Sequence, residues 1–518
     1  MAGKTRSIYV ISDLHIGGDY GDPNAEDASR KRGFRMMKHS KELAAFVTQL
    51  TLEAPVGTEL VINGDFIDFL AEQHEGARFR PFLFEPRLAL ETFEKIVLRD
   101  QPIFEALAGF CGKGNRLTIL LGNHDVELSL PDVRAALVRK LAVSPGTLRF
   151  VYDGEALVYG DALIEHGNAY DPANVVNHEG LTRVRGLRSR GFTDSGERFF
   201  TPPPGSQLVA SVMNPIKSEF GFIDLLKPES EPLFALLLAI APQYRKELGK
   251  AALALKGVAA NLMPRVGVPN YLANVSAVAS GPGSFEENVA GGLSESDRAL
   301  QAVLTFTVGD QAAQQLIDEA KAAEAFDNEQ PVASLIDRAR AGIGLVRLFL
   351  NGDKASLEQR IELVQSALLA LDGDQSFADD VETGGRYLEA AEALSESGYR
   401  YIVFGHTHHA KDVALKNGAR YFNTGTWANL MRFPAELLAG TDKDPCVVKD
   451  PSVRDERKAV ARKALLSFVK DIANNALDEY ITFRPTYVRL DLEDEKTVVR
   501  GELRTFNADG PLWLSSAP

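Results

Sequence analysis

Polar residues of the types that bind metal ions gather in five short clusters along the chain. Each cluster directly follows an apolar run that is typical of a buried strand, as SIYVIS precedes Asp13. The clusters are Asp13-Leu14-His15, Gly64-Asp65, Gly122-Asn123-His124-Asp125, His166-Gly167 and Gly405-His406-Thr407-His408. Loops at the carboxyl ends of strands are where an α/β scaffold presents functional groups, so we expect these side chains to meet at one site.

The residue types indicate which ions such a site would hold. Imidazole nitrogens together with carboxylate and amide oxygens, and without thiolates, suit manganese, iron or zinc ions. The two cysteines, Cys111 and Cys446, form neither a CxxC pair nor a disulfide framework. In an extended segment residues i and i+2 project to the same side, so the members of each DxH and HxH pair should aim at one point. A carboxylate bridging two ions, for which Asp65 is the best candidate, would hold them about 3.5–4 Å apart.

The order DxH, GD, GNHD, H and GHTH resembles the signature of the calcineurin-like metallophosphoesterases. The resemblance covers about residues 7–174 and 399–426. It implies a four-layer β-sandwich flanked by helices, with two metal ions. One ion would be held by Asp13, His15 and His408, the other by Asn123, His166 and His406, and Asp65 would bridge the two.

The same resemblance implies a reaction. His124 matches the family's catalytic histidine, which would lie beside the ions without binding them, stabilise developing charge and protonate the leaving oxygen. The implied activity is hydrolysis of a phosphate ester by a metal-bound hydroxide. Manganese is the first expectation for both ions, with iron or zinc as alternatives.

Two acidic residues beside these clusters are counted with His124 as catalytic. Asp68, in the segment GDFID, is expected to orient a neighbouring side chain rather than to bind an ion. Asp125 could fix the tautomer of His124 or cap the helix that follows, and the sequence leaves both roles open.

Other polar residues near the clusters are interpreted as structural. Asp171 and Asn174 could line the pocket beyond His166, but Asp171-Pro172 is also a helix-start signal, and we favour that interpretation. His409 adjoins the last cluster, and its side chain is expected to point away from the site to the surface.

The elements that must position these residues alternate between strands and helices, which indicates an α/β fold. Strands are expected at Ser7–Ser12, Glu59–Asn63 and Leu117–Leu121, with helices at Lys38–Leu52 and Leu88–Asp100. Hairpins are expected to turn at Gly160–Asp161 and at Asn417–Gly418. A helix at Arg454–Ala476 and closing strands at Thr486–Leu492 and Thr497–Phe506 complete the pattern.

Three segments follow from this pattern. Residues 1–175 and 398–518 are expected to form the two parts of a metallophosphoesterase core. Residues 176–397 are rich in Ala, Leu and Glu and are interpreted as a large, mostly helical insertion that serves as a lid or docks a partner. Helical periodicity marks Glu231–Val258, Ser294–Val308, Asp310–Ala325, Val332–Leu350, Ala355–Leu371 and Asp379–Ser395.

Composition limits the partners. The 518 residues carry a net charge of −14, which disfavours duplex nucleic acid and therefore the DNA-repair nucleases of the family. The longest strongly apolar run, Leu233–Ala241, is about half the roughly 20 residues that span a bilayer. With no signal-peptide pattern at the start, we expect a cytoplasmic protein. Peripheral membrane contact through the insertion stays open.

The expected substrate is a small phosphate ester: a phosphomonoester, a phosphodiester or a pyrophosphate. One alternative is a lipid-nucleotide pyrophosphatase similar to the UDP-2,3-diacylglucosamine hydrolases. The chain departs from those enzymes in having His124 where they typically have Arg, and in its longer insertion. A second alternative is a non-catalytic scaffold on the same fold. The sequence leaves the ester, the native metals, the role of the insertion and the oligomeric state open.

Overall fold

The computed structural model contains a mixed α/β core. The described residues are 6–21, 33–74, 78–143, 146–192, 196–225, 240–244, 356, 360, 378–382, 385–432, 434–440, 445–474, 476–493, 497–508 and 510. Two sheets, of six and five strands, form the centre of this part of the chain. The α/β class predicted from the sequence is therefore confirmed.

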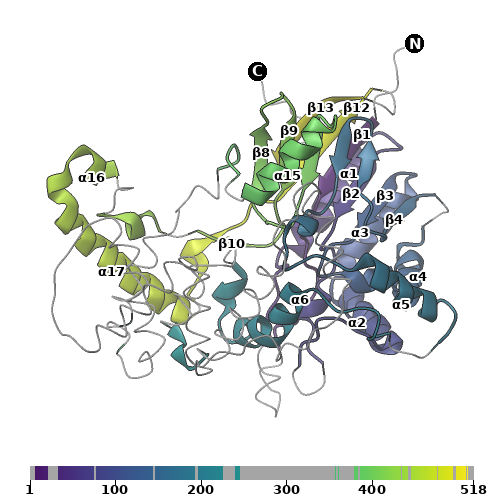
Figure 1. Ribbon diagram of the computed structural model, residues 1–518, viewed down its shortest axis with the longest axis horizontal. Coiled ribbons are helices and arrows are strands. Elements are labelled where there is room, and N and C mark those ends of the chain that lie inside the picture. The colour runs from purple at the N-terminus through teal and green to yellow at the C-terminus, as the bar shows by residue number, and fades with distance from the viewer. Residues whose placement is uncertain are drawn as a thin grey trace, which may run out of the picture.

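The six-stranded sheet joins the two ends of the chain (Figure 1). Its strands, in spatial order, are β13 (Val498–Thr505), β12 (Thr486–Leu492), β1 (Arg6–Ile11), β2 (Glu59–Asn63), β3 (Arg116–Leu120) and β4 (Leu148–Val151). Strands β1 to β4 are parallel, and β12 pairs antiparallel with both β1 and β13. The carboxyl ends of β1, β2 and β3 consequently lie side by side.

The five-stranded sheet is built from the middle and the last third of the chain. Its order is β5 (Leu157–Tyr159), β6 (Ala162–Ile164), β7 (Tyr401–Phe404), β9 (Arg420–Thr424) and β8 (Ala410–Ala414). Strands β6, β7 and β9 are parallel, while β5–β6 and β8–β9 are the two predicted hairpins. A short pair, β10 (Leu430–Met431) and β11 (Ile481–Thr482), lies outside both sheets.

A hydrophobic core fills the space between the two sheets. In β1, Ile8 and Val10 point into this core, where they meet residues of the other sheet such as Val403 and Phe422. Tyr9 and Ile11, on the opposite face of the same strand, belong to a second core. This alternation follows from the period of two in a strand, and it explains why β1 is apolar throughout.

Helices cover the outer faces of both sheets. The outer face of the six-stranded sheet shares its core with α1 (Ser40–Glu53), α2 (Pro86–Arg99), α3 (Gln101–Gly112), α4 (Pro131–Leu141) and α5 (His178–Arg188). On the five-stranded sheet, α15 (Gly385–Glu396) packs through Ala391 against Ile402 and Tyr421, and Figure 1 shows it along β8 and β9.

Short helical turns lie in the loops between these elements. They are η2 (Phe69–Ala71), η4 (Val126–Ser129), η5 (Asn168–Tyr170), η7 (Gly221–Leu225), η8 (Pro242–Tyr244), η10 (Ala435–Leu438), η11 (Pro451–Val453) and η12 (Asp478–Tyr480). Helix α6 (Pro204–Leu208), the π turn η6 (Val209–Met213) and α7 (Asn214–Lys217) follow one another without a break. Near the end of the chain come α16 (Pro445–Lys449) and the predicted helix α17 (Arg454–Ala473), which Figure 1 shows away from the sheets.

The beginning of the predicted insertion belongs to the main core. Leu181, Val184 and Phe200 lie in the same hydrophobic cluster as α1 to α4, so packing shows no break at residue 176. The helix expected from Asp379 begins at Gly385, because Asp379 pairs with Arg484 and its carbonyl accepts from the backbone of Asp412. The helices predicted at Glu231–Val258, Ser294–Val308, Asp310–Ala325, Val332–Leu350 and Ala355–Leu371 lie outside the described residues, apart from residues 240–244, 356 and 360.

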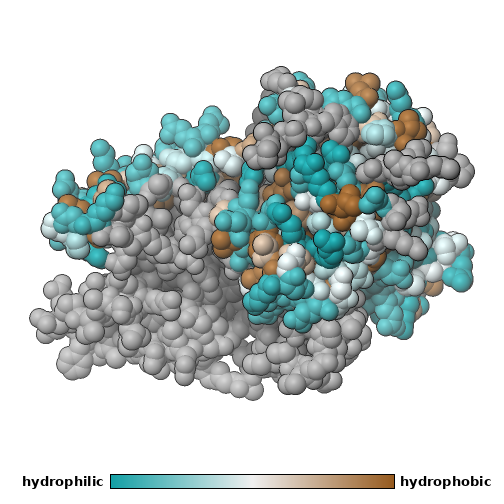
Figure 2. All heavy atoms as spheres, turned by 90° about the horizontal axis from the view of Figure 1, so that it is seen from above, coloured by the Kyte–Doolittle hydropathy of each residue, from teal (hydrophilic) through white to brown (hydrophobic). Residues whose placement is uncertain are grey.

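The outer surface of the described part is mixed in polarity. Figure 2 shows hydrophilic residues interspersed with smaller hydrophobic groups on the face seen from above. Within the described ranges, no helix has both the length and the apolar character needed to cross a membrane.

Candidate metal centre

Loops from both sheets bring six of the seven predicted metal ligands together. They follow β1, β2, β6 and β7 at the carboxyl ends of parallel strands. The potential ligand groups are Asp13 with His15 and His408; Asp65 with His166 and His406; and His15 with Asp65 and His124. Within each group the ligand atoms lie within 4.8 Å of one another. Residues almost 400 positions apart, such as His15 and His408, thus share one site.

The distances between these atoms suit shared coordination. His15 Nε2 lies 3.1 Å from His408 Nε2, which is 3.4 Å from Asp13 Oδ1. His166 Nε2 lies 3.2 Å from Asp65 Oδ2, and His15 Nε2 lies 3.8 Å from that same oxygen. Ligand bonds of about 2.1 Å at tetrahedral or octahedral angles place neighbouring ligand atoms about 3.0–3.4 Å apart. Asp65 therefore belongs to two potential ligand groups, one with His166 and His406 and one with His15 and His124.

The backbone at the site is unusual. Six non-glycine residues of the described chain have positive φ, and five of them are predicted ligands: Asp13 (51°), His15 (44°), Asp65 (49°), His406 (69°) and His408 (65°). The sixth is Ala142. The paired side chains therefore converge through left-handed backbone, and the expectation that they alternate along an extended segment was wrong. Such strain gathers at functional sites.

Glycines of the motifs allow the loops to pack closely on the ligands. A Cβ on Gly64 would lie 2.4 Å from His166 Nδ1, and one on Gly122 would lie 2.0 Å from Asp65 Oδ1. A Cβ on Gly405 would lie 2.7 Å from Asp13 Oδ2. A side chain at any of these three positions would displace a predicted ligand.

Three of the predicted histidine ligands, His15, His166 and His406, have a ring nitrogen held by another group. His15 Nδ1 lies 3.2 Å from Asp68 Oδ2, and His166 Nδ1 donates to the carbonyl of Asn63 at 2.8 Å. His406 Nε2 lies 3.2 Å from Asp171 Oδ2. This arrangement fixes each imidazole and leaves its second nitrogen for an ion, as is usual in metal sites.

Asn123, the seventh predicted ligand, has a buried side-chain oxygen that a cation could contact. Its Oδ1 is buried and makes no hydrogen bond with any described residue, while its Nδ2 lies 3.4 Å from Asn174 Oδ1. A buried acceptor without a partner costs about 1–3 kcal/mol, a cost that a cation would remove. The donor set therefore fits hard or borderline metal ions.

His124 lies at the edge of the cluster. Its backbone N–H donates to Asp65 Oδ1 at 2.9 Å, and its Nδ1 lies 3.2 Å from Asp68 Oδ1. Burial alone would lower the pKa of His124, but the carboxylates of Asp68 and Asp65 outweigh burial and raise it to about 9. Lys217 opposes this rise. Asp68 thus holds both His15 and His124, as expected for an orienting residue.

Opposite charges dominate the centre of the cluster. Burial disfavours a charged Asp65, yet the imidazoles of His166, His124 and His15 hold the pKa of Asp65 well below its usual range. The pKa of His166 is raised to about 10, because the charge of Asp65 outweighs burial. Cations are therefore strongly favoured beside this carboxylate, and a metal ion that binds here would displace protons from the imidazoles.

Asp125 has neither of its predicted roles. Its carboxylate caps no helix, and it is Asp68 that contacts the His124 ring. Asp125 instead accepts from the backbone N–H groups of Gly122 at 2.7 Å and Phe66 at 2.8 Å, so it ties two ligand loops together. Burial and the charge of Asp65 raise its pKa.

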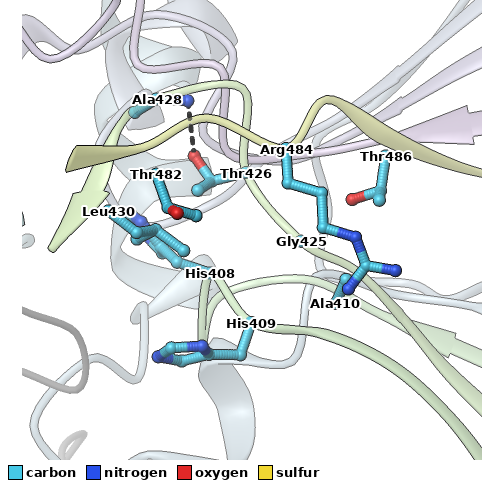
Figure 3. A pocket seen from close by; sticks show the side chains of 10 residues that line it. All are labelled: His408, His409, Ala410, Gly425, Thr426, Ala428, Leu430, Thr482, Arg484 and Thr486. Atoms are coloured by element: carbon cyan, nitrogen blue, oxygen red, sulfur yellow. Dashed lines mark hydrogen bonds between the residues drawn. The ribbon is translucent and has the colours of Figure 1, made fainter. Parts of the chain in front are cut away.

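Two other interpretations were wrong. Asp171 and Asn174 start no helix: Asp171 contacts His406, and Asn174 Nδ2 donates to Asp171 Oδ2 at 2.7 Å. The sequence feature that could have indicated this role of Asp171 and Asn174 was their closeness to His166. His409 is buried rather than exposed, and with His408 and Arg484 it lines a cavity of about 30 Å³ (Figure 3).

Comparisons with known proteins give little further guidance. No protein-family model matches the chain. The chain is similar to Glutamate--tRNA ligase 1 of Erythrobacter litoralis (strain HTCC2594), at 28% identity over 190 residues. This match covers 34% of the chain, which spans only 38% of the length of that ligase. A match of this extent does not show a family.

Proposed function

We propose that this chain is a dinuclear-metal phosphoesterase with the calcineurin-like fold. The observation that carries the proposal is the convergence of Asp13, His15, Asp65, His166, His406 and His408 from the ends of four parallel strands. The order of layers supports it as well: helices, six-stranded sheet, five-stranded sheet and helix correspond to the four-layer sandwich that the resemblance implies.

In this proposal Asp13, His15 and His408 hold one ion, Asn123, His166 and His406 hold the other, and Asp65 bridges them. The two ions, manganese in the first instance, would supply an activated water and neutralise the phosphate oxygens. The chain itself aligns the imidazoles through Asp68, Asn63 and Asp171, which keeps the ligand set arranged before an ion arrives.

His124 is the proposed proton donor. The carboxylates of Asp68 and Asp65 favour the protonated form of the His124 ring, and Asp68 fixes the ring at the edge of the cluster. A positioned, protonated imidazole can transfer a proton to a leaving oxygen. Asp65 and Asp68, which stabilise the imidazolium, would keep this proton available until the leaving group accepts it.

The proposal is tested by treating the protein with EDTA, adding Mn²⁺, Fe²⁺ or Zn²⁺, and following hydrolysis of p-nitrophenyl phosphate and bis-p-nitrophenyl phosphate. Metal content is measured in parallel by mass spectrometry. We expect Asp65→Asn to lose metal and turnover together, because it removes the bridging charge. His124→Ala should keep metal and lose turnover by roughly 10²–10⁴-fold, the usual contribution of general acid–base catalysis.

The matched control is Asp455→Asn. The Asp455 side chain is 95% exposed on α17, so this substitution should change neither metal content nor turnover. A wild-type protein that is inactive with every metal would favour the scaffold alternative. Metal-free His124→Ala protein would show that His124 is a ligand instead. Activity confined to lipid-linked nucleotides would favour the lipid-nucleotide pyrophosphatase.

A further inference from the structure

Two arginine side chains meet at one aromatic ring on the outer side of the six-stranded sheet. The guanidinium carbon of Arg134, in α4, lies 4.1 Å from the centre of the Tyr152 ring. That of Arg185, in α5, lies 4.9 Å from the same point. Tyr152 directly follows β4 and packs against the core under these helices. Two positive charges from different helices are thus gathered beside one tyrosine.

Arg185 is buried and is held in place by neutral groups. Only 8% of this residue is exposed. Two of its nitrogens donate to the carbonyl of Tyr152 at 3.0 Å and to the Thr182 hydroxyl at 2.7 Å. These hydrogen bonds orient the guanidinium group but do not balance its charge. Because a buried charge without an opposite charge is costly, the site favours an anion.

Both guanidinium groups also have hydrogen-bond donors to offer. Arg185 Nε makes no hydrogen bond with a described residue and keeps contact with solvent. The half-buried Arg134 side chain makes no hydrogen bond with any residue that the structure describes. An oxyanion beside Tyr152 could therefore accept from both helices without displacing an existing partner.

No carboxylate of the described residues forms an ion pair with either arginine. Asp153, whose charge acts on Arg185, accepts instead from the backbone N–H of Glu155 at 3.2 Å. Arg183, on the same helix as Arg185, shows the more usual arrangement, since it pairs with Glu179 at 2.6 Å. The pair formed by Arg134 and Arg185 thus differs from its neighbour in lacking a partner of opposite charge.

The electrostatic balance points in the same direction. Burial and the charge of Arg134 lower the pKa of Arg185, and Tyr152 and Asp153 offset only part of this effect. The two guanidinium groups therefore repel each other in the protein without an anion. Guanidinium groups match the oxygens of phosphate in geometry and charge, so a bound phosphoryl group would remove this repulsion.

The arginine pair lies at the edge of the sheet where α/β folds bind ligands. Strand β4 runs parallel to β3, and the Leu121 N–H donates to the carbonyl of Val151 at 3.2 Å. Tyr152 comes next after Val151, so it lies at the carboxyl end of its strand. Neither arginine belongs to the predicted metal ligands, and the pair is a separate feature of this edge.

We propose that Arg134 and Arg185 form a binding site for a phosphoryl group, carried by inorganic phosphate or by a small organic phosphate. The phosphoryl oxygens supply the negative charge that the two guanidinium groups lack. The Tyr152 ring keeps both arginines in place before the anion arrives. Because no predicted metal ligand takes part, the site does not depend on the proposed phosphoesterase activity.

The first test measures anion binding to the full chain after EDTA treatment. Inorganic phosphate and phenylphosphonate, which contains no ester bond, are titrated separately by calorimetry. We expect wild type to bind at least one of them, and Arg134→Gln to bind it at least tenfold more weakly. Tighter binding of phosphate would assign the site to the free anion, and tighter binding of phenylphosphonate would assign it to an organic phosphate.

Two further variants locate the binding. Arg139→Gln removes an exposed charge from the same helix and should bind like wild type. Arg134→Lys keeps the charge without the planar group, and should bind more tightly than Arg134→Gln. The proposal would be overturned by wild type that binds neither probe, by unchanged binding in Arg134→Gln, or by an equal loss in Arg139→Gln.

Thermal unfolding separates this role from a purely structural one. A ligand that binds the folded state raises Tm, so phosphate should raise Tm of EDTA-treated wild type and of Arg139→Gln but not of Arg134→Gln. If Arg134 only packs on Tyr152, phosphate would shift Tm of Arg134→Gln as much as that of wild type. An inactive wild type with intact phosphate binding would refute the proposed function and leave this site standing.

Discussion

Asp68 shows how single residues connect parts of the site that lie far apart in the chain. Its two oxygens contact His15, 53 positions before it, and His124, 56 positions after it. The sequence could indicate the candidate ligands because each lies in a short motif after a strand. Asp171 could not be predicted in this way, because its role depends on His406 in a distant segment rather than on a neighbour.

A glycine of the site offers a test at this scale. We predict that Gly122→Ala disrupts the metal centre, because its Cβ would lie 2.0 Å from Asp65 Oδ1 and would displace the bridging carboxylate. Manganese affinity, measured by calorimetry, should fall at least tenfold, and the free energy of unfolding should fall by about 1–3 kcal/mol.

The matched control is Gly109→Ala in α3, where a Cβ would meet nothing within 4 Å. It should leave metal affinity unchanged and raise stability by up to about 1 kcal/mol, since alanine favours a helix. Wild-type affinity in Gly122→Ala would mean that Asp65 does not need this close contact to bind metal.

At the scale of elements, strands were predicted better than helices. The strands β1, β2 and β3 are buried on both faces, so their continuous apolar runs end close to the predicted residues. Helix α3 was missed, because it starts at Gln101 directly after α2 and the Asp100-Gln101-Pro102 segment resembles a loop in the sequence. The π turn in residues 209–213 has no simple sequence signal.

Turn η4 contains a buried acid that should make stability depend on pH. Glu127 is fully buried, accepts from the Leu83 backbone at 2.9 Å, and has a pKa raised by burial from 4.5 to about 8. The folded protein therefore binds this proton more tightly than the unfolded chain. The contribution of this proton to the free energy of unfolding is fully present below about pH 4.5. It decreases by up to about 1.4 kcal/mol per pH unit as the pH rises, and it is lost once the pH has passed through 8.

We predict that Glu127→Gln, which is neutral at every pH, removes this dependence. Urea unfolding should show the variant within about 1 kcal/mol of wild type at pH 5 and more stable than wild type at pH 9. Glu94→Gln, at an exposed position of α2, should follow the wild-type curve. Parallel curves for wild type and Glu127→Gln would show that Glu127 is charged in the folded protein.

In the whole molecule, the two ends of the chain are interleaved rather than placed in separate units. Strand β12 pairs with β1, and β7 lies between β6 and β9. The candidate metal centre also draws on both ends, because His406 and His408 come from the second part and Asp13 from the first. Folding and assembly of the site should therefore occur together.

This arrangement predicts that residues 1–225 do not fold alone. Without β12 and β7, both β1 and β6 lose a partner, and apolar faces of both sheets become exposed. Thermal unfolding followed by circular dichroism should show no cooperative transition for the fragment, while the full chain shows one. A sharp transition in the fragment would mean that its half of the core is sufficient for folding.

The left-handed backbone of the five ligand residues has an evolutionary consequence. At about 1 kcal/mol each, their conformations together oppose folding by on the order of 5 kcal/mol, comparable to the lower range of net stability of a domain. Substitution of glycine at any of these five positions would relieve this strain and raise the free energy of unfolding. A lineage without need of the site should therefore drift away from these side chains early.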